Sequence, residues 1–188
     1  MKKIFAIIGN PISHSLSPIL HNYWFKKYSI NAEYTLLDVK ENELENITKK
    51  IRAKELDGIN ITLPYKQKII PFVDQLINDA KITNSINTIY LGQNNTLIGE
   101  NTDVFGLQAA YLKEITQTEN KKALVIGAGG VSPSVIFSLY KMKIKNISLV
   151  NRTYDKSIFL KKKFKFLNIL DWKFLKQEIK NFDIIINA

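Results

Sequence analysis

Short apolar runs alternate with longer amphipathic stretches along most of the chain. The apolar runs predict strands at residues 4–8, 34–39, 58–63, 85–91, 96–100 and 123–126, one that ends at Val150, and one in the final DIIINA segment. Helices are expected at residues 17–28, over ELENITKKIRA from a cap at Asn42, from about residue 66, and over VFGLQAAYLKEI. This alternation is typical of an α/β protein.

The polar segment TQTENKK, residues 116–122, divides this pattern into two parts. We expect a first domain at residues 1–103, a connecting helix and linker at residues 104–120, and a second domain at residues 121–188. In the first domain, the strands at 85–91 and 96–100 flank the turn-rich GQNN and predict an antiparallel pair. The length of 188 residues suits two small domains or one full one.

The composition excludes several classes of site and location. The chain has no cysteine, so a disulfide framework, a zinc-cysteine cluster and a thiol nucleophile are excluded, and we expect no metal site. The apolar run after Lys2 and Lys3 stops at Gly9, too early for a signal peptide. No other run approaches the roughly 20 residues of a membrane span. We therefore expect a cytoplasmic protein without a membrane partner.

The net charge of +10 raises the question of an anionic partner. Nearly all of this charge comes from lysines spread along the chain, and only Arg52 and Arg152 are arginines. No helix-turn-helix, aromatic RNA-binding motif or zinc finger accompanies the lysines. A solvated lysine-rich surface is favoured over nucleic-acid binding.

A glycine-rich loop follows the strand at residues 123–126 and precedes an apolar helix. It reads Gly127-Ala-Gly-Gly-Val-Ser132, where glycines allow a tight turn and the close approach of a pyrophosphate to the helix N-terminus. Ser132 stands where the third glycine of the dinucleotide fingerprint would be. The loop favours dinucleotide binding over a plain tight turn, because both flanking elements are of the expected type.

The end of the next strand indicates which dinucleotide is bound. NAD enzymes usually carry an acidic residue there for the ribose hydroxyls. This chain has Asn151, Arg152 and Thr153 after Val150, and a guanidinium binds a 2′-phosphate where a carboxylate would repel it. The pattern predicts NADP. The alternative is a surface arginine in a turn before a helix capped by Thr153.

The stretch GNPISHSLSPILHN, residues 9–22, leads from the first strand into a helix. Ser17 is expected as N-cap and Pro18 as the first helical residue, which leaves Ser15 unexplained. In the strand at 58–63, the two-residue period places Asn60 and Thr62 on one face. A nicotinamide moves only hydride, so the protein itself must handle a proton.

The motifs GNPISHSLSP, NITLPYK, SINT, GENTD, GAGGVS, NRT and the terminal INA, in this order, resemble the shikimate dehydrogenase family over essentially the whole chain. The resemblance implies a substrate-binding α/β domain followed by a Rossmann-type NADP-binding domain. It also implies reversible NADPH-dependent reduction of 3-dehydroshikimate to shikimate in aromatic amino-acid biosynthesis, by a monomer or homodimer with a small-molecule substrate. The alternatives are a quinate/shikimate dehydrogenase paralogue and a truncated, non-catalytic remnant that binds NADP or shikimate.

The resemblance also assigns roles to single residues. Lys66 and Asp103 are the expected catalytic pair, and the sequence does not decide which is the net acid or base. The alternative interpretation of Lys66 is a surface lysine, and that of Asp103 is a helix cap. Lys66 is expected near a helix start, where an anionic partner would offset the unfavourable dipole. The expected substrate contacts are Ser15 and Ser17 for a carboxylate and Asn60, Thr62 and Asn87 for ring hydroxyls. The expected cofactor contacts are Gly127, Ala128, Gly129, Gly130, Val131, Asn151, Arg152, Thr153 and Lys156.

The last strand raises the question of completeness. In a doubly wound sheet, DIIINA should lie beside the strand that precedes the glycine loop, near the centre of the sheet. Members of the resembling family continue beyond this point. We therefore expect a chain that lacks the C-terminal part of the family, with an apolar strand at an exposed edge.

Overall fold

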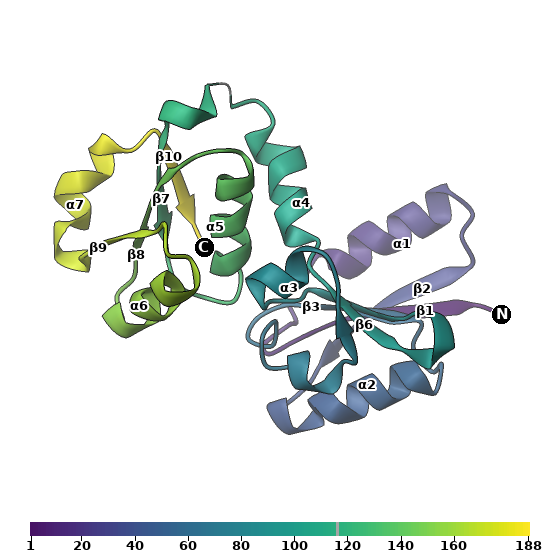
Figure 1. The fold of residues 1–188 in the computed structure, drawn as a ribbon. Helices are drawn as coiled ribbons and strands as arrows, with labels where there is room; N and C mark the ends of the chain where they lie inside the picture. Colours follow the sequence, from purple (N-terminus) through teal and green to yellow (C-terminus); the bar gives the residue numbers. More distant parts are fainter. Residues whose placement is uncertain (116) are drawn as a thin grey trace. The chain divides into compact units, whose positions relative to one another are not determined.

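The computed structural model describes residues 1–115 and 117–188, and it divides into two compact units, Met1–Thr102 and Asp103–Ala188. Each unit consists of a sheet with helices packed on it (Figure 1). Residues 104–115, expected as part of a connection, group with the second unit. Residue 116 of the expected linker lies outside the described residues. No helix in the described ranges has the length and hydropathy needed to cross a membrane.

The first unit contains a six-stranded mixed sheet in the order β2-β1-β3-β5-β6-β4. Strand β1 is parallel to β2 and β3, β5 is antiparallel to β3 and β6, and β4 is parallel to β6. The pairing of β5 with β6 confirms the hairpin predicted around GQNN. The strands are β1 (Lys3–Gly9), β2 (Ala32–Asp38), β3 (Gly58–Ile61), β4 (Gln75–Leu76), β5 (Thr88–Leu91) and β6 (Leu97–Glu100).

Helices α1 (Ser17–Lys27) and α2 (Leu44–Arg52) lie on opposite faces of this sheet (Figure 1). Helix α2 buries Leu44, Ile47 and Ile51 in the main core, because these residues recur at helical spacing. Helix α1 buries no residue completely. A 3₁₀ turn at Glu41–Glu43 precedes α2, and the Glu43 carboxylate accepts the Lys40 N–H at 2.6 Å. Glu43 occupies the N-cap position of α2, so the expected cap at Asn42 is wrong.

The helix expected from about residue 66 is wrong. Residues 66–69 form turns, followed by a single 3₁₀ turn at Ile70–Phe72, strand β4 and the short helix α3 (Asp79–Thr83). Pro71 lies in the middle of the apolar run, where it cannot donate a helical hydrogen bond. The Asp74 carboxylate instead accepts Leu97 N–H at 2.7 Å, which draws the segment onto the sheet.

The second unit contains a parallel four-stranded sheet in the order β10-β7-β8-β9. Strand β10 lies beside β7, as expected for DIIINA, and forms an edge of this sheet with Ile185 48% exposed. Helices α5 and α6 contribute to one core with the sheet. The elements are α4 (Asp103–Leu107), β7 (Lys122–Ile126), α5 (Ser132–Lys141), β8 (Asn146–Val150), α6 (Tyr154–Lys163), β9 (Asn168–Leu170), α7 (Leu175–Glu178) and β10 (Ile184–Asn187).

Both sheets place an aspartate immediately before a parallel strand. Asp57 precedes β3; its N–H donates to the carbonyl of Ile4 at 2.7 Å, and its carboxylate accepts the Ile4 N–H at 2.7 Å. Asp183 precedes β10 and forms the same reciprocal pair with Lys122, at 2.9 and 2.8 Å. The Lys122 N–H, followed by the Lys121 side chain, holds the pKa of Asp183 below its usual range. Each aspartate therefore satisfies backbone groups near the start of the neighbouring strand.

Candidate functional site

In the first unit, four strands end or begin on the same side of the sheet, and the chain segments next to these strand ends lie there. This side is called the edge of the sheet at the strand ends. The carboxyl ends of the parallel strands β1 and β3 share this edge. Since β5 is antiparallel to β3, its amino end lies there too, and so does the carboxyl end of β6. The polar residues of these segments are Ser15 and Ser17 after β1, Thr62 and Lys66 after β3, Asn87 before β5 and Thr102 after β6.

Gly9, at the end of β1, allows two of these segments to approach closely. A side-chain carbon on Gly9 would lie 2.7 Å from Thr62 Cγ2 and 3.0 Å from the carbonyl oxygen of Leu63. The backbone of Thr62 donates to Ile8 O at 3.0 Å, and Asn10 N–H donates to Leu63 O at 3.2 Å. The loop after β1 and the turn after β3 are thus joined at the sheet edge.

The two serines of the opening loop have different local roles from those expected. Helix α1 begins at Ser17, and Leu16 occupies the N-cap position, so the prediction of Ser17 as N-cap is wrong. The Ser15 hydroxyl oxygen accepts the Ser17 N–H at 3.3 Å. Ser15 therefore satisfies one of the free amides of the first helical turn, a task that sequence rules had given to Ser17.

Asn60 is held in a fixed orientation within β3. Its Oδ1 accepts the Tyr34 hydroxyl at 2.7 Å, and its Nδ2 donates to Asn87 O and Thr88 Oγ1, both at 3.1 Å. Burial raises the pKa of Tyr34, so the phenol remains a donor at all ordinary pH values. The Tyr34 ring stacks on His21 at 4.2 Å between ring centres, and burial lowers the pKa of that histidine. His21 therefore packs against Tyr34.

The side chain of Asn87 holds Thr102, the last residue of the first unit, by hydrogen bonds. It lies one residue before β5, and its Oδ1 accepts the Thr102 N–H at 2.9 Å while its Nδ2 donates to Thr102 Oγ1 at 2.9 Å. Its backbone carbonyl accepts Ile61 N–H at 2.9 Å. Asn87 therefore links the loop after β6, through its side chain, to the end of β3, through its backbone carbonyl. Asp103 follows Thr102 directly and begins α4 in the second unit.

Lys66 lies in the turn after β3 and is only 8% exposed, so it is not the surface lysine of the alternative reading. No helix begins at this turn, so the helix-dipole argument for an anionic partner is wrong. The turn is anchored on both sides: the Tyr65 hydroxyl donates to Val39 O at 2.7 Å, and Lys66 O accepts Ile86 N–H at 2.8 Å. A buried amine on a fixed turn is well suited to proton transfer, because its position is set before a ligand arrives.

In the second unit, a cavity of about 430 Å³ lies where the carboxyl ends of all four parallel strands meet. Ligands of open parallel sheets bind at this edge. Of the expected cofactor contacts, Gly130, Val131 and Thr153 do not line the cavity. The lining residues are Ile126, Gly127, Ala128, Gly129, Asn151, Arg152, Lys156, Trp172, Asn187 and Ala188.

The glycine loop is shaped for a close ligand. Gly127 has φ +112°, and a side-chain carbon on it would overlap the carbonyl oxygen of Ala188. A side-chain carbon on Gly129 would meet nothing within 4 Å, so the backbone there faces open space. The Ser132 hydroxyl donates to Gly127 O at 3.0 Å, and helix α5 begins at Ser132. The serine in place of a third glycine therefore braces the loop.

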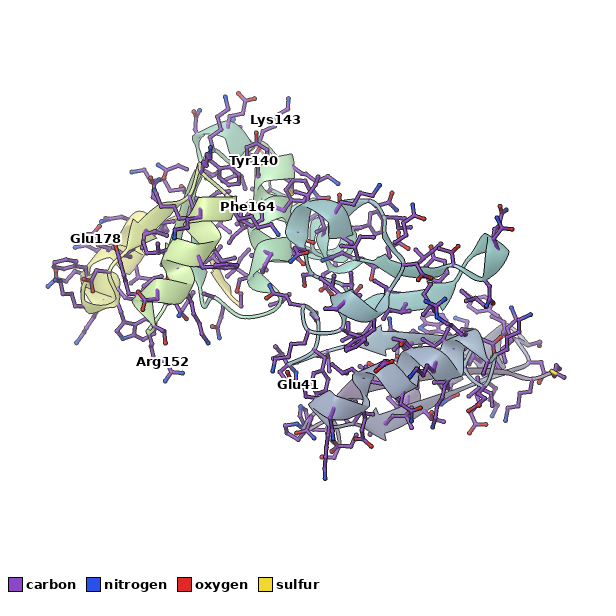
Figure 2. The ribbon with its side chains drawn as sticks, turned by 60° about the horizontal axis from the view of Figure 1, so that its bottom comes forward. Glu41, Tyr140, Lys143, Arg152, Phe164 and Glu178 are labelled. Carbon is purple, nitrogen blue, oxygen red and sulfur yellow. The ribbon has the colours of Figure 1, made fainter. Side chains whose placement is uncertain are left out.

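The charges of this cavity suit a phosphate-rich dinucleotide. Arg152 and Lys156 line it, and no Asp or Glu side chain does among the described residues. Figure 2 shows the Arg152 side chain pointing away from the ribbon of the second unit. Thr153 occupies the N-cap position of α6 without a side-chain capping bond, which weakens the reading of this turn as a mere helix cap. The open backbone at Gly129 and the two cations are the donor set that NADP requires.

Comparisons with known proteins find matches in both units of the chain. The model of the shikimate dehydrogenase substrate binding domain matches residues 7–89, and that of shikimate/quinate 5-dehydrogenase matches residues 110–188. The NADP⁺-dependent shikimate dehydrogenase of Pelagibacter ubique is 49% identical over the whole chain, which covers 69% of that protein. The chain belongs to the shikimate dehydrogenase family.

Solved structures of the shikimate dehydrogenase family have the same fold. The Aquifex aeolicus enzyme is 33% identical, with a TM-score of 0.90 over 99% of this chain and 68% of its own. The Thermus thermophilus enzyme, solved with NADP(H) and shikimate, is 28% identical, with a TM-score of 0.85 over 99% of this chain and 68% of its own. The chain thus spans about two thirds of the length of these family members, as the resemblance implied.

The sequence of this shikimate dehydrogenase family member did not predict one residue at each of the two sites. Tyr34 orients Asn60, and Trp172 lines the cavity in the second unit. A tyrosine within a predicted strand, such as Tyr34, is usually interpreted as a core residue. Trp172 follows a strand of three residues and belongs to no recognised sequence motif. The only available signal was position: Trp172 follows the carboxyl end of β9, where a parallel sheet binds its ligands.

Proposed function

We propose that this chain binds NADP in the second unit and shikimate or 3-dehydroshikimate in the first, and that it catalyses their reversible oxidation and reduction. The single observation that supports it best is the cavity at the carboxyl ends of β7, β8, β9 and β10, where open glycine backbone and Arg152 occur together. As a member of its family the protein is an NADP-dependent oxidoreductase of the shikimate pathway.

In this proposal, the backbone at Gly129 and the N-terminus of α5 bind the pyrophosphate, and Arg152 binds the 2′-phosphate. A guanidinium presents two parallel N–H groups to a phosphate, which an ammonium cannot do. Lys156 adds a second positive charge in the same cavity. When bound, NADPH supplies the hydride for reduction of the ketone. Arg152 therefore selects NADP over NAD.

The substrate contacts follow from the hydrogen-bonding capacity of each group. Ser15 and Ser17 are proposed to bind the carboxylate at the start of α1, where the helix dipole favours negative charge. Both hydrogens of Asn60 Nδ2 are used inside the unit, so its contact with a ring hydroxyl is as an acceptor, through the second lone pair of Oδ1. Thr62 and Asn87 are the other proposed hydroxyl contacts.

Lys66 is proposed as the group that handles the proton. During reduction its ammonium donates a proton to the oxygen of the ketone as the carbon accepts hydride, and the product is the alcohol. In the reverse direction the neutral amine accepts the hydroxyl proton. A carboxylate beside a lysine favours its charged form, which is the role proposed for Asp103. Variants of each residue decide which of the two is the net acid or base.

The test is a turnover assay on this chain, with formation of the reduced nicotinamide, NADPH or NADH, followed in four arms: shikimate or quinate, each with NADP or NAD. We expect NADPH formation with shikimate and NADP, and much weaker signals in the other arms. Preference for quinate would favour the paralogue. Binding of NADP without turnover in any arm would contradict the proposed reaction and favour a non-catalytic remnant. The monomeric or dimeric state and the cytoplasmic location stay predictions.

A further inference from the structure

Trp172 is a large aromatic residue on the wall of the cavity in the second unit. It follows the carboxyl end of β9 and is 43% exposed. The preceding Asp171 accepts the Lys173 N–H at 3.0 Å and so caps the 3₁₀ turn Trp172–Phe174. The backbone that carries the indole is therefore fixed, while much of the indole surface is accessible.

The order of the strands determines which part of a dinucleotide reaches Trp172. The open glycine backbone follows β7, and the turn with Asn151 and Arg152 follows β8, next to it in the sheet. With the pyrophosphate at the first and the 2′-phosphate at the second, the ribose lies over β8. The base on that ribose then extends away from the pyrophosphate, over β9. Trp172 lines the cavity at this end.

We propose that Trp172 is the platform on which the adenine of NADP stacks. The inference rests on the proposed NADP site and adds to it the residue that recognises the base. Stacking of a base on an aromatic side chain changes affinity by about ten-fold or more. The other residues that line the cavity are glycine, alanine, isoleucine, asparagine and two cations, so Trp172 supplies its aromatic surface.

Another reading of this exposed indole is a protein contact surface shared with Phe174, which is 44% exposed. The position of Trp172 favours the adenine platform, because it lines the same cavity as Gly127, Gly129 and Arg152. Phe174 is not among the residues that line the cavity. A surface for a partner protein would not require the indole to share a wall with the glycine loop.

The two tryptophans of the chain make the test direct, because Trp24 lies in the first unit and Trp172 in the second. In Trp24→Phe protein, Trp172 is the one remaining tryptophan, so tryptophan emission reports on it alone. We expect NADP and adenosine 2′,5′-bisphosphate to quench this fluorescence and nicotinamide mononucleotide to leave it unchanged. Trp172→Ala should weaken binding of both adenine ligands about ten-fold by calorimetry, Trp172→Phe should retain most of the affinity, and Trp24→Ala should change nothing.

The outcomes separate this inference from the proposed function. Tight NADP binding by Trp172→Ala, or no quench on saturation with NADP, overturns the adenine platform and leaves the reaction intact. Failure of the unaltered chain to bind either adenine ligand overturns the NADP site and the platform with it. Quenching with normal adenine affinity but no turnover supports the platform and counts against the proposed reaction alone. Circular dichroism of each variant verifies the fold.

Discussion

Asn60 and Asn87 in the first unit have their side-chain amides bound to neighbouring strands and loops, whereas Arg152 and Lys156 in the second unit are exposed on their cavity. The first site is thus built from interlocked neutral groups around one buried lysine, and the second from open backbone and exposed cations. Hydroxyl groups require donors and acceptors in fixed directions, while a phosphate attracts cations from several directions. The difference indicates that ligand binding at the first site depends on the orientation of its side chains. Ligand binding at the second site depends on positive charge and on open space at the backbone.

We expect the largest effect from substitution of Lys66, the buried lysine of the first site. Lys66→Ala should lower the turnover number by about 100- to 10,000-fold, because proton transfer is lost, with little change in shikimate affinity. Steady-state kinetics and equilibrium binding measure the two quantities. Lys68→Ala, an exposed lysine two residues later in the same turn, is the control and should retain turnover. Near-normal turnover of Lys66→Ala would exclude its proposed role.

The next effect distinguishes two glycines of one loop. Gly127→Ala should destabilise the second unit by about 2–4 kcal/mol, since the new methyl group meets Ala188 O and φ is positive. Gly129→Ala should change stability by less than about 0.5 kcal/mol, because its methyl group enters open space, but should weaken NADP binding. Urea unfolding followed by Trp172 fluorescence in the Trp24→Phe background, and NADP titration, measure these effects. Equal losses of stability would contradict this account.

A smaller effect tests charge at the second site. Arg152→Gln should weaken NADP binding about ten-fold while leaving NAD binding unchanged, because only NADP carries the 2′-phosphate. Isothermal titration with both cofactors measures the ratio. The other arginine of the chain serves as control: Arg52 binds Asp74 at 2.7 Å in the first unit, so Arg52→Gln should leave both cofactor affinities unaltered. Equal losses for NADP and NAD would show that Arg152 does not read the 2′-phosphate.

The smallest effect tests orientation at the first site. Tyr34→Phe removes the hydroxyl that holds Asn60 Oδ1 and should cost about 1 kcal/mol of folding free energy. We expect weaker shikimate binding and unchanged NADP binding, since the network belongs to the first unit. Tyr28→Phe alters an exposed tyrosine of the same unit and should change neither. Unchanged shikimate affinity in Tyr34→Phe would show that this hydrogen bond does not prepare the site.

Much of the second unit could be predicted from the sequence because its signals are local. The strand before the glycine loop, the loop itself and Arg152 occur within about 30 residues, and the partner strand DIIINA reads as a buried strand. The first unit was harder. Its site joins segments that lie far apart in the sequence, so Tyr34 gave no sign of its bond to Asn60. Propensity also failed after β3, where Pro71 and the Asp74–Leu97 bond replace the expected helix by turns and a short strand.

The aspartates before β3 and β10 have a consequence for the alignment of the strands. Because side chains alternate along a strand, a slip of one residue would move Asn60 to the face now occupied by Ile59 and Ile61. Such a slip would also remove the Asp57 carboxylate from the Ile4 N–H, leaving an amide without its acceptor. The hydrogen bond from Ile4 to Asp57 therefore favours the observed register of β3 against β1, and this register sets the face of the sheet on which Asn60 lies.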